Sequence, residues 1–95
     1  MTQQIIGIKY IRKTCERNPS QWEVKLIDGR MLYIRYRWGA LSIRVSSKKT
    51  DGIMDAVNGK EILGEKLGTG FDGFLDDDVM KHYLKRALEK LANEM

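Results

Sequence analysis

Apolar and polar residues alternate along residues 31–47, a pattern that predicts two strands with a single buried face. On the first strand that face carries Leu32, Ile34, Tyr36 and Trp38. The phase reverses after Gly39-Ala40, and the same face continues with Leu41, Ile43 and Val45. A two-residue loop requires this reversal, and glycine at its first position suits a type II′ turn, where φ is positive. We therefore expect a hairpin that turns at residues 39–40, with Trp38 in the core opposite Leu41.

Two further strands precede this hairpin. Residues 4–13 form an apolar-rich run with isoleucines on both faces, so either row can point inward. Residues 21–26 alternate strictly, and their apolar face carries Trp22, Val24 and Leu26. The inward residues are even-numbered both before and after the turn that joins residues 21–26 to the hairpin. A three-residue loop at residues 27–29 keeps this pattern, with Gly29 in the left-handed position. This loop predicts that Val24 lies opposite Leu32.

Apolar residues recur at helical spacing in the C-terminal segment, residues 76–95. Three aspartates open it and favour a helix start, through capping and through the helix dipole: Asp76, Asp77 and Asp78. Residues 51–75 form a glycine-rich connection, with one short helix or strand near residues 59–67. The prediction is a single α+β domain over residues 1–95. In it, the C-terminal helix covers one face of a four-stranded antiparallel meander built from residues 1–50.

Basic residues concentrate in the first half of the chain. Of the net charge of +4, residues 1–50 contribute eleven Lys or Arg and three Asp or Glu, a balance of +8. Residues 51–95 contain six basic and ten acidic residues, a balance of −4. This asymmetry indicates a basic surface on the meander and favours an anionic partner.

The outward face of the predicted hairpin carries much of this charge. In the predicted register Arg35 lies opposite Arg44, which destabilises a strand pair unless an anion compensates it. Glu23, diagonal to Arg35, offers partial relief. The candidate binding residues are the basic side chains of this face and its edge, with one outward tyrosine: Lys9, Lys25, Tyr33, Arg35, Arg37, Arg44, Lys48 and Lys49.

Three interpretations of this face stay open. Arginine suits phosphate oxygens and Tyr33 can stack on a base, which favours nucleic acid or a nucleic-acid-handling assembly. RNA-binding sheets, however, present two or three aromatic residues. Arginine and tyrosine are also frequent at protein interfaces, which favours a regulator or inhibitor that binds an acidic protein surface. The third interpretation is a solvated face. Nucleic acid is our working hypothesis, and a homodimer through the first strand also stays open.

Other chemical signals are weak in their context. Residues 68–73 match G-x-G-x-x-G, but no parallel βαβ unit surrounds them, so an ordinary loop is favoured over a phosphate site. The aspartates lack the ligand spacing of a calcium loop. Neither His82 nor Cys15 has a recognisable catalytic neighbour in the sequence. We expect no enzymatic activity, no metal and no cofactor.

The sequence also indicates the cellular compartment. No apolar run approaches the ~18 residues that a membrane-spanning helix needs, and the N-terminal residues lack a secretory signal pattern. The single cysteine, Cys15, excludes an internal disulfide. A reducing compartment suits such a chain, so we expect a cytoplasmic protein without a membrane partner.

Overall fold

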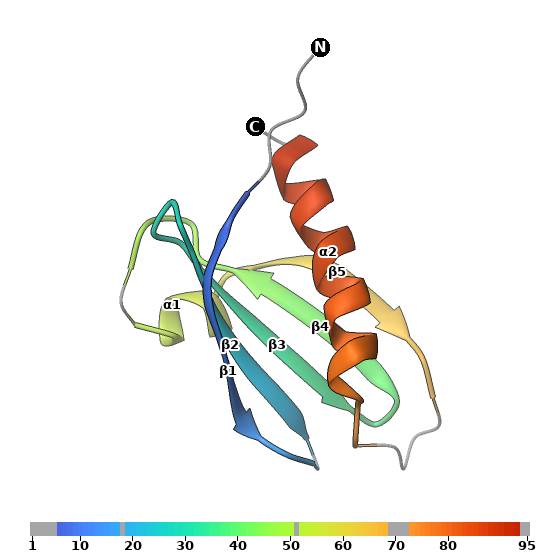
Figure 1. The fold of residues 1–95 in the computed structure, drawn as a ribbon. Coiled ribbons are helices and arrows are strands. Elements are labelled where there is room, and N and C mark those ends of the chain that lie inside the picture. Colours follow the sequence, from blue (N-terminus) through green and yellow to red (C-terminus); the bar gives the residue numbers. More distant parts are fainter. Residues whose placement is uncertain (1–5, 18, 51, 69–72, 94–95) are drawn as a thin grey trace.

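The computed structural model describes residues 6–17, 19–50, 52–68 and 73–93. In chain order these residues form β1 (Ile8–Cys15), β2 (Ser20–Leu26), β3 (Met31–Arg37), β4 (Ala40–Val45), α1 (Met54–Val57), β5 (Lys60–Lys66) and α2 (Asp77–Asn93) (Figure 1). The strands pair antiparallel in the order β1-β2-β3-β4-β5. The predicted α+β class and C-terminal helix are confirmed. The prediction of four strands is wrong, because part of the glycine-rich connection extends the sheet as β5.

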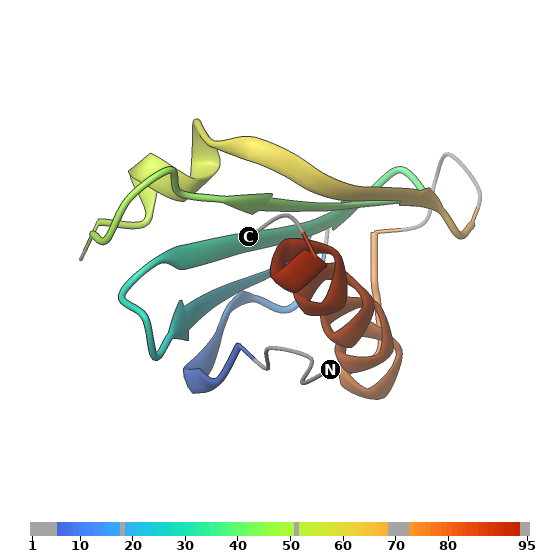
Figure 2. The same cartoon turned by 90° about the horizontal axis from the view of Figure 1, so that it is seen from above.

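The two helices lie on opposite sides of the sheet. Figure 2 shows α2 within the concave side of the twisted sheet and α1 beyond β4 on the other side. We call the side that faces α2 the inner face and the opposite side the outer face. α1 lies against β3 and β4. α1 therefore covers part of the outer face.

The core fills the space between the inner face and α2. Leu32 of β3 lies between Val24 of β2 and Val45 of β4, and all three are buried. The predicted pairing of Val24 with Leu32 is confirmed, as is the three-residue loop before β3. Gly29 of that loop has φ +99°, and its N–H donates to the carbonyl of Leu26 at 3.0 Å. α2 contributes the buried side chains Met80, Leu84, Ala87 and Leu91.

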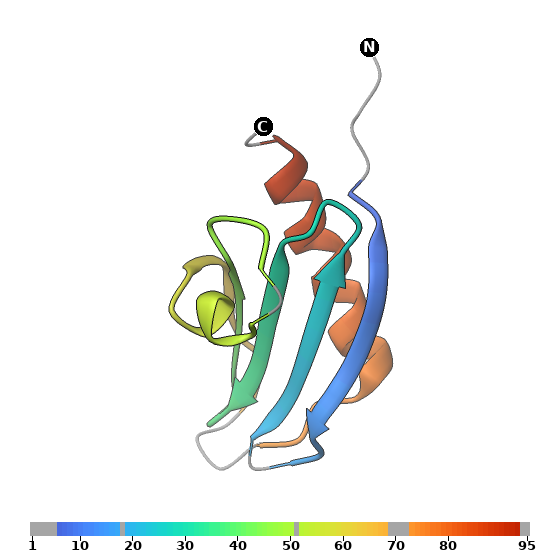
Figure 3. The same ribbon diagram turned by 90° about the vertical axis from the view of Figure 1, so that its left-hand side faces the viewer.

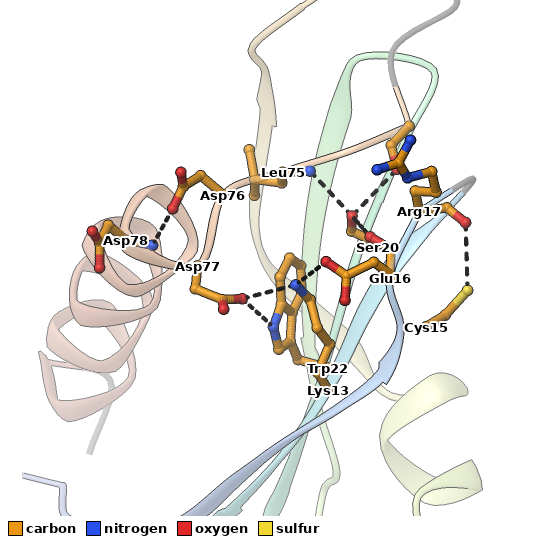
Figure 4. A network of polar contacts seen from close by, with 11 residues as sticks. Lys13, Cys15, Glu16, Arg17, Ser20, Trp22, Leu75, Asp76, Asp77 and Asp78 are labelled. Carbon is orange, nitrogen blue, oxygen red and sulfur yellow. Dashed lines mark hydrogen bonds and ion pairs between the residues drawn. The ribbon is translucent and has the colours of Figure 1, made fainter.

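The start of α2 is bonded to β1 and β2. The Asp76 carboxylate accepts the backbone N–H of Asp78 at 3.0 Å, as expected for an N-cap. Figure 4 shows Asp77 reaching the inner face of the sheet, where it accepts the indole N–H of Trp22 at 3.1 Å and pairs with Lys13 at 3.2 Å. The hydrogen bond from Lys13 lowers the pKa of Asp77. This network fixes the angle at which α2 enters the core.

The pairing register of the β3–β4 hairpin differs from the predicted one by two residues. Trp38 and Gly39 form its loop, with φ values of 55° and 74°, which corresponds to the type I′ class. Tyr36 therefore pairs with Leu41, and Trp38 leaves the core with 62% of its surface exposed. The predicted turn at Gly39-Ala40 and the core position of Trp38 are wrong. A two-residue shift keeps every side chain on its face, so the alternation itself is confirmed.

Candidate nucleic-acid interface

Strand pairing arranges the outer face in four rows that cross the sheet. From the Trp38-Gly39 turn towards the opposite end, the rows are Arg37–Ala40–Lys66, Gln21–Arg35–Ser42–Gly64, Arg12–Glu23–Tyr33–Arg44–Glu61 and Tyr10–Lys25–Met31–Ser46. Residues that pair directly share a face, because successive side chains on a strand alternate between faces. The predicted opposition of Arg35 and Arg44 is therefore wrong, since the register brings Arg35 opposite Ser42 and Arg44 opposite Tyr33.

The third row compensates its own charges. Arg12 forms an ion pair with Glu23 across β1 and β2, which raises the pKa of Arg12. Arg44 donates to the backbone carbonyl of Gly59 at 3.1 Å and lies opposite Glu61 of β5 in the strand register. The Tyr33 hydroxyl accepts the side-chain amide of Gln21 at 2.7 Å, from the neighbouring row. This row alternates positive and negative groups and presents little net charge to a partner.

The chain segment that contains α1 covers the fourth row. The Lys25 ammonium donates to the backbone carbonyls of Gly29, at 3.1 Å, and Thr50. Met31 lies on the outer face yet is only 2% exposed. Its backbone N–H donates to the Ser46 hydroxyl at 3.0 Å, which ties the chain after β4 to β3. Lys25 and this end of the outer face are therefore engaged by the protein itself and do not form part of an open binding surface. Figure 3 shows how α1 and its flanking loops project beside β3 at this end.

The first two rows remain open and positively charged. They contain Arg35, Arg37 and Lys66, and within the described residues none of the three forms an ion pair. The Arg35 Nε is buried and has no hydrogen-bond partner there. The nearest acid on this side is Glu61 of the third row, whose carboxylate accepts the Ser42 hydroxyl at 2.7 Å. Among the four rows, exposed positive charge without an ion pair therefore lies in the two rows next to the Trp38-Gly39 turn.

Small side chains hollow the surface beside these cations. Arg35, Arg37, Trp38, Ala40 and Ser42 line a shallow depression of about 170 Å³. Alanine, serine and the neighbouring Gly64 rise little above the backbone, whereas the arginines on β3 and the indole at the turn stand higher. We call this set the basic corner: Arg35, Arg37, Trp38, Ala40, Ser42 and Lys66.

The turn beside the depression is held in place by the end of β5. The Gly39 carbonyl accepts two backbone N–H groups, from Leu67 at 2.7 Å and Gly68 at 3.1 Å. The Arg37 guanidinium lies over the Trp38 ring, 4.2 Å from its centroid. These contacts order the indole and the cations before any ligand arrives, which lowers the entropy cost of binding.

The remaining predicted residues lie away from the basic corner. Lys48 and Lys49 line a second depression of about 270 Å³ at the opposite end of β3, together with Asp28 and Arg30. There the Arg30 guanidinium donates to Asp28 at 2.9 and 2.7 Å and lowers its pKa, so that part of the positive charge is compensated. Lys9 lies at a pairing irregularity of the edge strand β1. Of the eight predicted residues, the structure brings Arg35 and Arg37 together at the basic corner and Lys48 and Lys49 together at the second depression.

Trp38 and Lys66 were missed by the sequence reasoning. The available signal for Trp38 was its position just before Gly39, because glycine is favoured at the second loop position of a type I′ hairpin. Lys66 could be found only by recognising residues 60–66 as a strand that pairs with β4. Its charge lies 29 residues after Arg37 in the chain but in the same row of the sheet.

The other candidate residues are dispersed. His82 is exposed on α2, with its ring 5.0 Å from that of Tyr83 in an edge-on arrangement. In Figure 4, Cys15 lies at the side away from α2, and its thiol donates to the carbonyl of Arg17, at 3.5 Å. Within the described ranges, no three His, Cys, Asp or Glu side chains gather as metal ligands. The central part of the G-x-G-x-x-G motif and Asp72 lie outside the described residues.

No family model, curated protein or solved structure matches the chain. Among the described residues, neither helix has the length and apolar character needed to cross a membrane. Function is therefore inferred from the side chains and their arrangement alone.

Proposed function

We propose that the chain is a non-enzymatic binding domain that takes nucleic acid at the basic corner of its outer face. The carrying observation is the local excess of charge. Arg35, Arg37 and Lys66 occupy two neighbouring rows, and none has a carboxylate partner among the described residues. Clustered cations of this kind attract a polyanion, and the guanidinium fork suits phosphate oxygens in particular.

The buried Nε of Arg35 strengthens the case for a ligand. A buried donor without an acceptor costs free energy, so most such groups in folded proteins are paired. A phosphate oxygen that enters the depression can accept from Arg35 in the bound state. Phosphate contacts position a nucleic acid without reading its sequence, so this site alone supports general rather than sequence-specific binding.

The salt dependence of binding tests the proposal. Anisotropy of a labelled oligonucleotide gives the association constant over a series of salt concentrations, and its logarithmic slope counts the phosphates contacted. The test variant carries Arg35→Gln, Arg37→Gln and Lys66→Gln. If three phosphate contacts are lost from a single strand, the slope should become shallower by about 2, because each contributes roughly 0.7.

A matched control separates the site from overall charge. Lys81, Lys85 and Lys90 are exposed on α2, and changing all three to glutamine lowers the net charge by the same amount. We expect this control to bind nearly as tightly as the wild type. Equal losses in the two variants would contradict the basic corner as the site. Poly-L-glutamate that binds as tightly as the oligonucleotide would replace the proposal with a regulator that binds an acidic protein.

A further inference from the structure

The Trp38 backbone is in a conformation that its side chain disfavours. With a φ of 55° it is the one non-glycine residue among those described that has a positive φ. The left-handed region is unfavourable for a residue with a bulky side chain, and the first loop position of a type I′ turn normally holds asparagine, aspartate or glycine. Strained residues cluster at binding sites, where the surrounding structure holds them.

The Trp38 side chain is also poorly placed for stability. The indole is 62% exposed, whereas the other tryptophan, Trp22, is 1% exposed and fully packed in the core. Neither the backbone nor the burial of Trp38 therefore favours tryptophan here. What the ring does supply is a flat aromatic wall of the depression, with the Arg37 guanidinium over it.

The surroundings of the ring point to a base as its ligand. A depression of about 170 Å³ is smaller than a typical small-molecule pocket, and it suits one flat group rather than a whole ligand. Carboxylates of an acidic protein would satisfy Arg35 and Lys66 but would leave the indole unused. A nucleotide uses both parts, because its base can stack on tryptophan while its phosphates meet the cations.

We infer that the basic corner selects single-stranded over double-stranded nucleic acid by stacking an unpaired base on Trp38. This inference rests on the proposed function. Inside a duplex each base is covered on both faces by neighbouring base pairs, so away from the duplex ends the indole reaches a base face only where the strand is unpaired. The phosphate contacts of Arg35, Arg37 and Lys66 are shared by both forms, so Trp38 provides the discrimination.

The experiment compares one DNA oligonucleotide as a single strand and annealed to its complement. The test variant is Trp38→Asn, which removes the ring and suits the turn. Its control is Ile27→Asn, which removes another exposed apolar side chain, 70% exposed in the opposite hairpin loop. We expect Trp38→Asn to weaken single-strand binding about tenfold or more and to weaken duplex binding much less, so that the preference for the single strand falls. Trp38→Phe should retain most of the single-strand affinity.

Tryptophan fluorescence provides a second readout. Because Trp22 is buried, stacking on Trp38 should quench the exposed part of the emission with the single strand and much less with the duplex. Equal affinity for the two forms, or unchanged single-strand affinity in Trp38→Asn, would overturn the inference. Salt-dependent binding that needs the three cations but not Trp38 would leave the proposed function intact. Absence of such binding to either form would refute both.

Discussion

Replacing Trp38 by asparagine should stabilise the protein, although it removes the largest side chain of the proposed site. The left-handed conformation costs a non-glycine residue roughly 1–2 kcal/mol, and asparagine tolerates it far better than tryptophan. The substitution also removes the Arg37 cation–π contact, which is worth about 0.5–1 kcal/mol at an exposed position. At the midpoints of these ranges the net gain in unfolding free energy is about 0.75 kcal/mol, which corresponds to a rise in Tm of about 3–6 °C.

Urea and thermal unfolding followed by circular dichroism measure this change. Ile27→Asn is again the control, because it removes an exposed apolar side chain at a position without a positive φ. Its unfolding free energy should stay within about 0.5 kcal/mol of the wild type. A loss of 1 kcal/mol or more in Trp38→Asn would refute the reasoning, because it would show that the indole packs in the core. Greater stability with weaker binding would indicate that Trp38 is retained for its ligand.

Two further predictions concern carboxylates. Asp77→Asn should make the unfolding free energy fall less steeply as the pH drops below about 4. In the wild type, the pKa of Asp77 is lower in the folded than in the unfolded state. The stability that this difference contributes is present above the unfolded-state pKa and is lost as the pH falls through the folded-state pKa. Urea unfolding across this pH range checks it: the gap between wild type and Asp77→Asn should narrow at low pH, while Glu89→Gln, at an exposed position of the same helix, should track the wild type. Glu61→Gln should strengthen oligonucleotide binding several-fold at low salt, because it removes the acid nearest the basic corner and keeps an acceptor for Ser42. Unchanged binding by anisotropy would show that the phosphates do not pass this edge of the sheet.

Pairing of two copies through β1 stays a prediction of the sequence. β1 is an edge strand of the sheet, and Ile8, Tyr10 and Ile11 on it are 36–43% exposed. Lysines on an edge strand and an irregularity in its pairing are features that oppose such contacts.

Local chemistry in the sequence was sufficient for β2, β3 and α2. Between β2 and β3 the alternation requires a loop with an odd number of residues, and Gly29 provides the left-handed position that a three-residue loop needs. The helix follows from apolar spacing and from an aspartate at its start, whose cap the structure confirms at Asp76. The sequence predicted only a short helix or strand in the region of β5, because the pairing of β5 shifts near Ile43 and its alternation is broken.

The register of the β3–β4 hairpin needed the tertiary structure. Moving the loop by one position, from residues 39–40 to 38–39, shifts the pairing register by two residues, so both turns keep the same side chains inward and the alternation cannot separate them. What separates them is the length of β2. That strand begins at Ser20, opposite Tyr36, so an inward Trp38 would lie beyond the described pairing of β2 with β3.

The sequence by itself therefore determined the class of fold, the inward face of each central strand and the excess of positive charge on the first half of the chain. The tertiary structure decided where that charge stays uncompensated. It paired Arg12 with Glu23, bound Lys25 to backbone carbonyls and left Arg35 and Arg37 open. It also placed an exposed indole and a lysine from β5 beside them. Strand register decides which residues from distant parts of the chain lie side by side. The local sequence pattern determines the face on which a side chain lies, but it does not determine the row across the sheet.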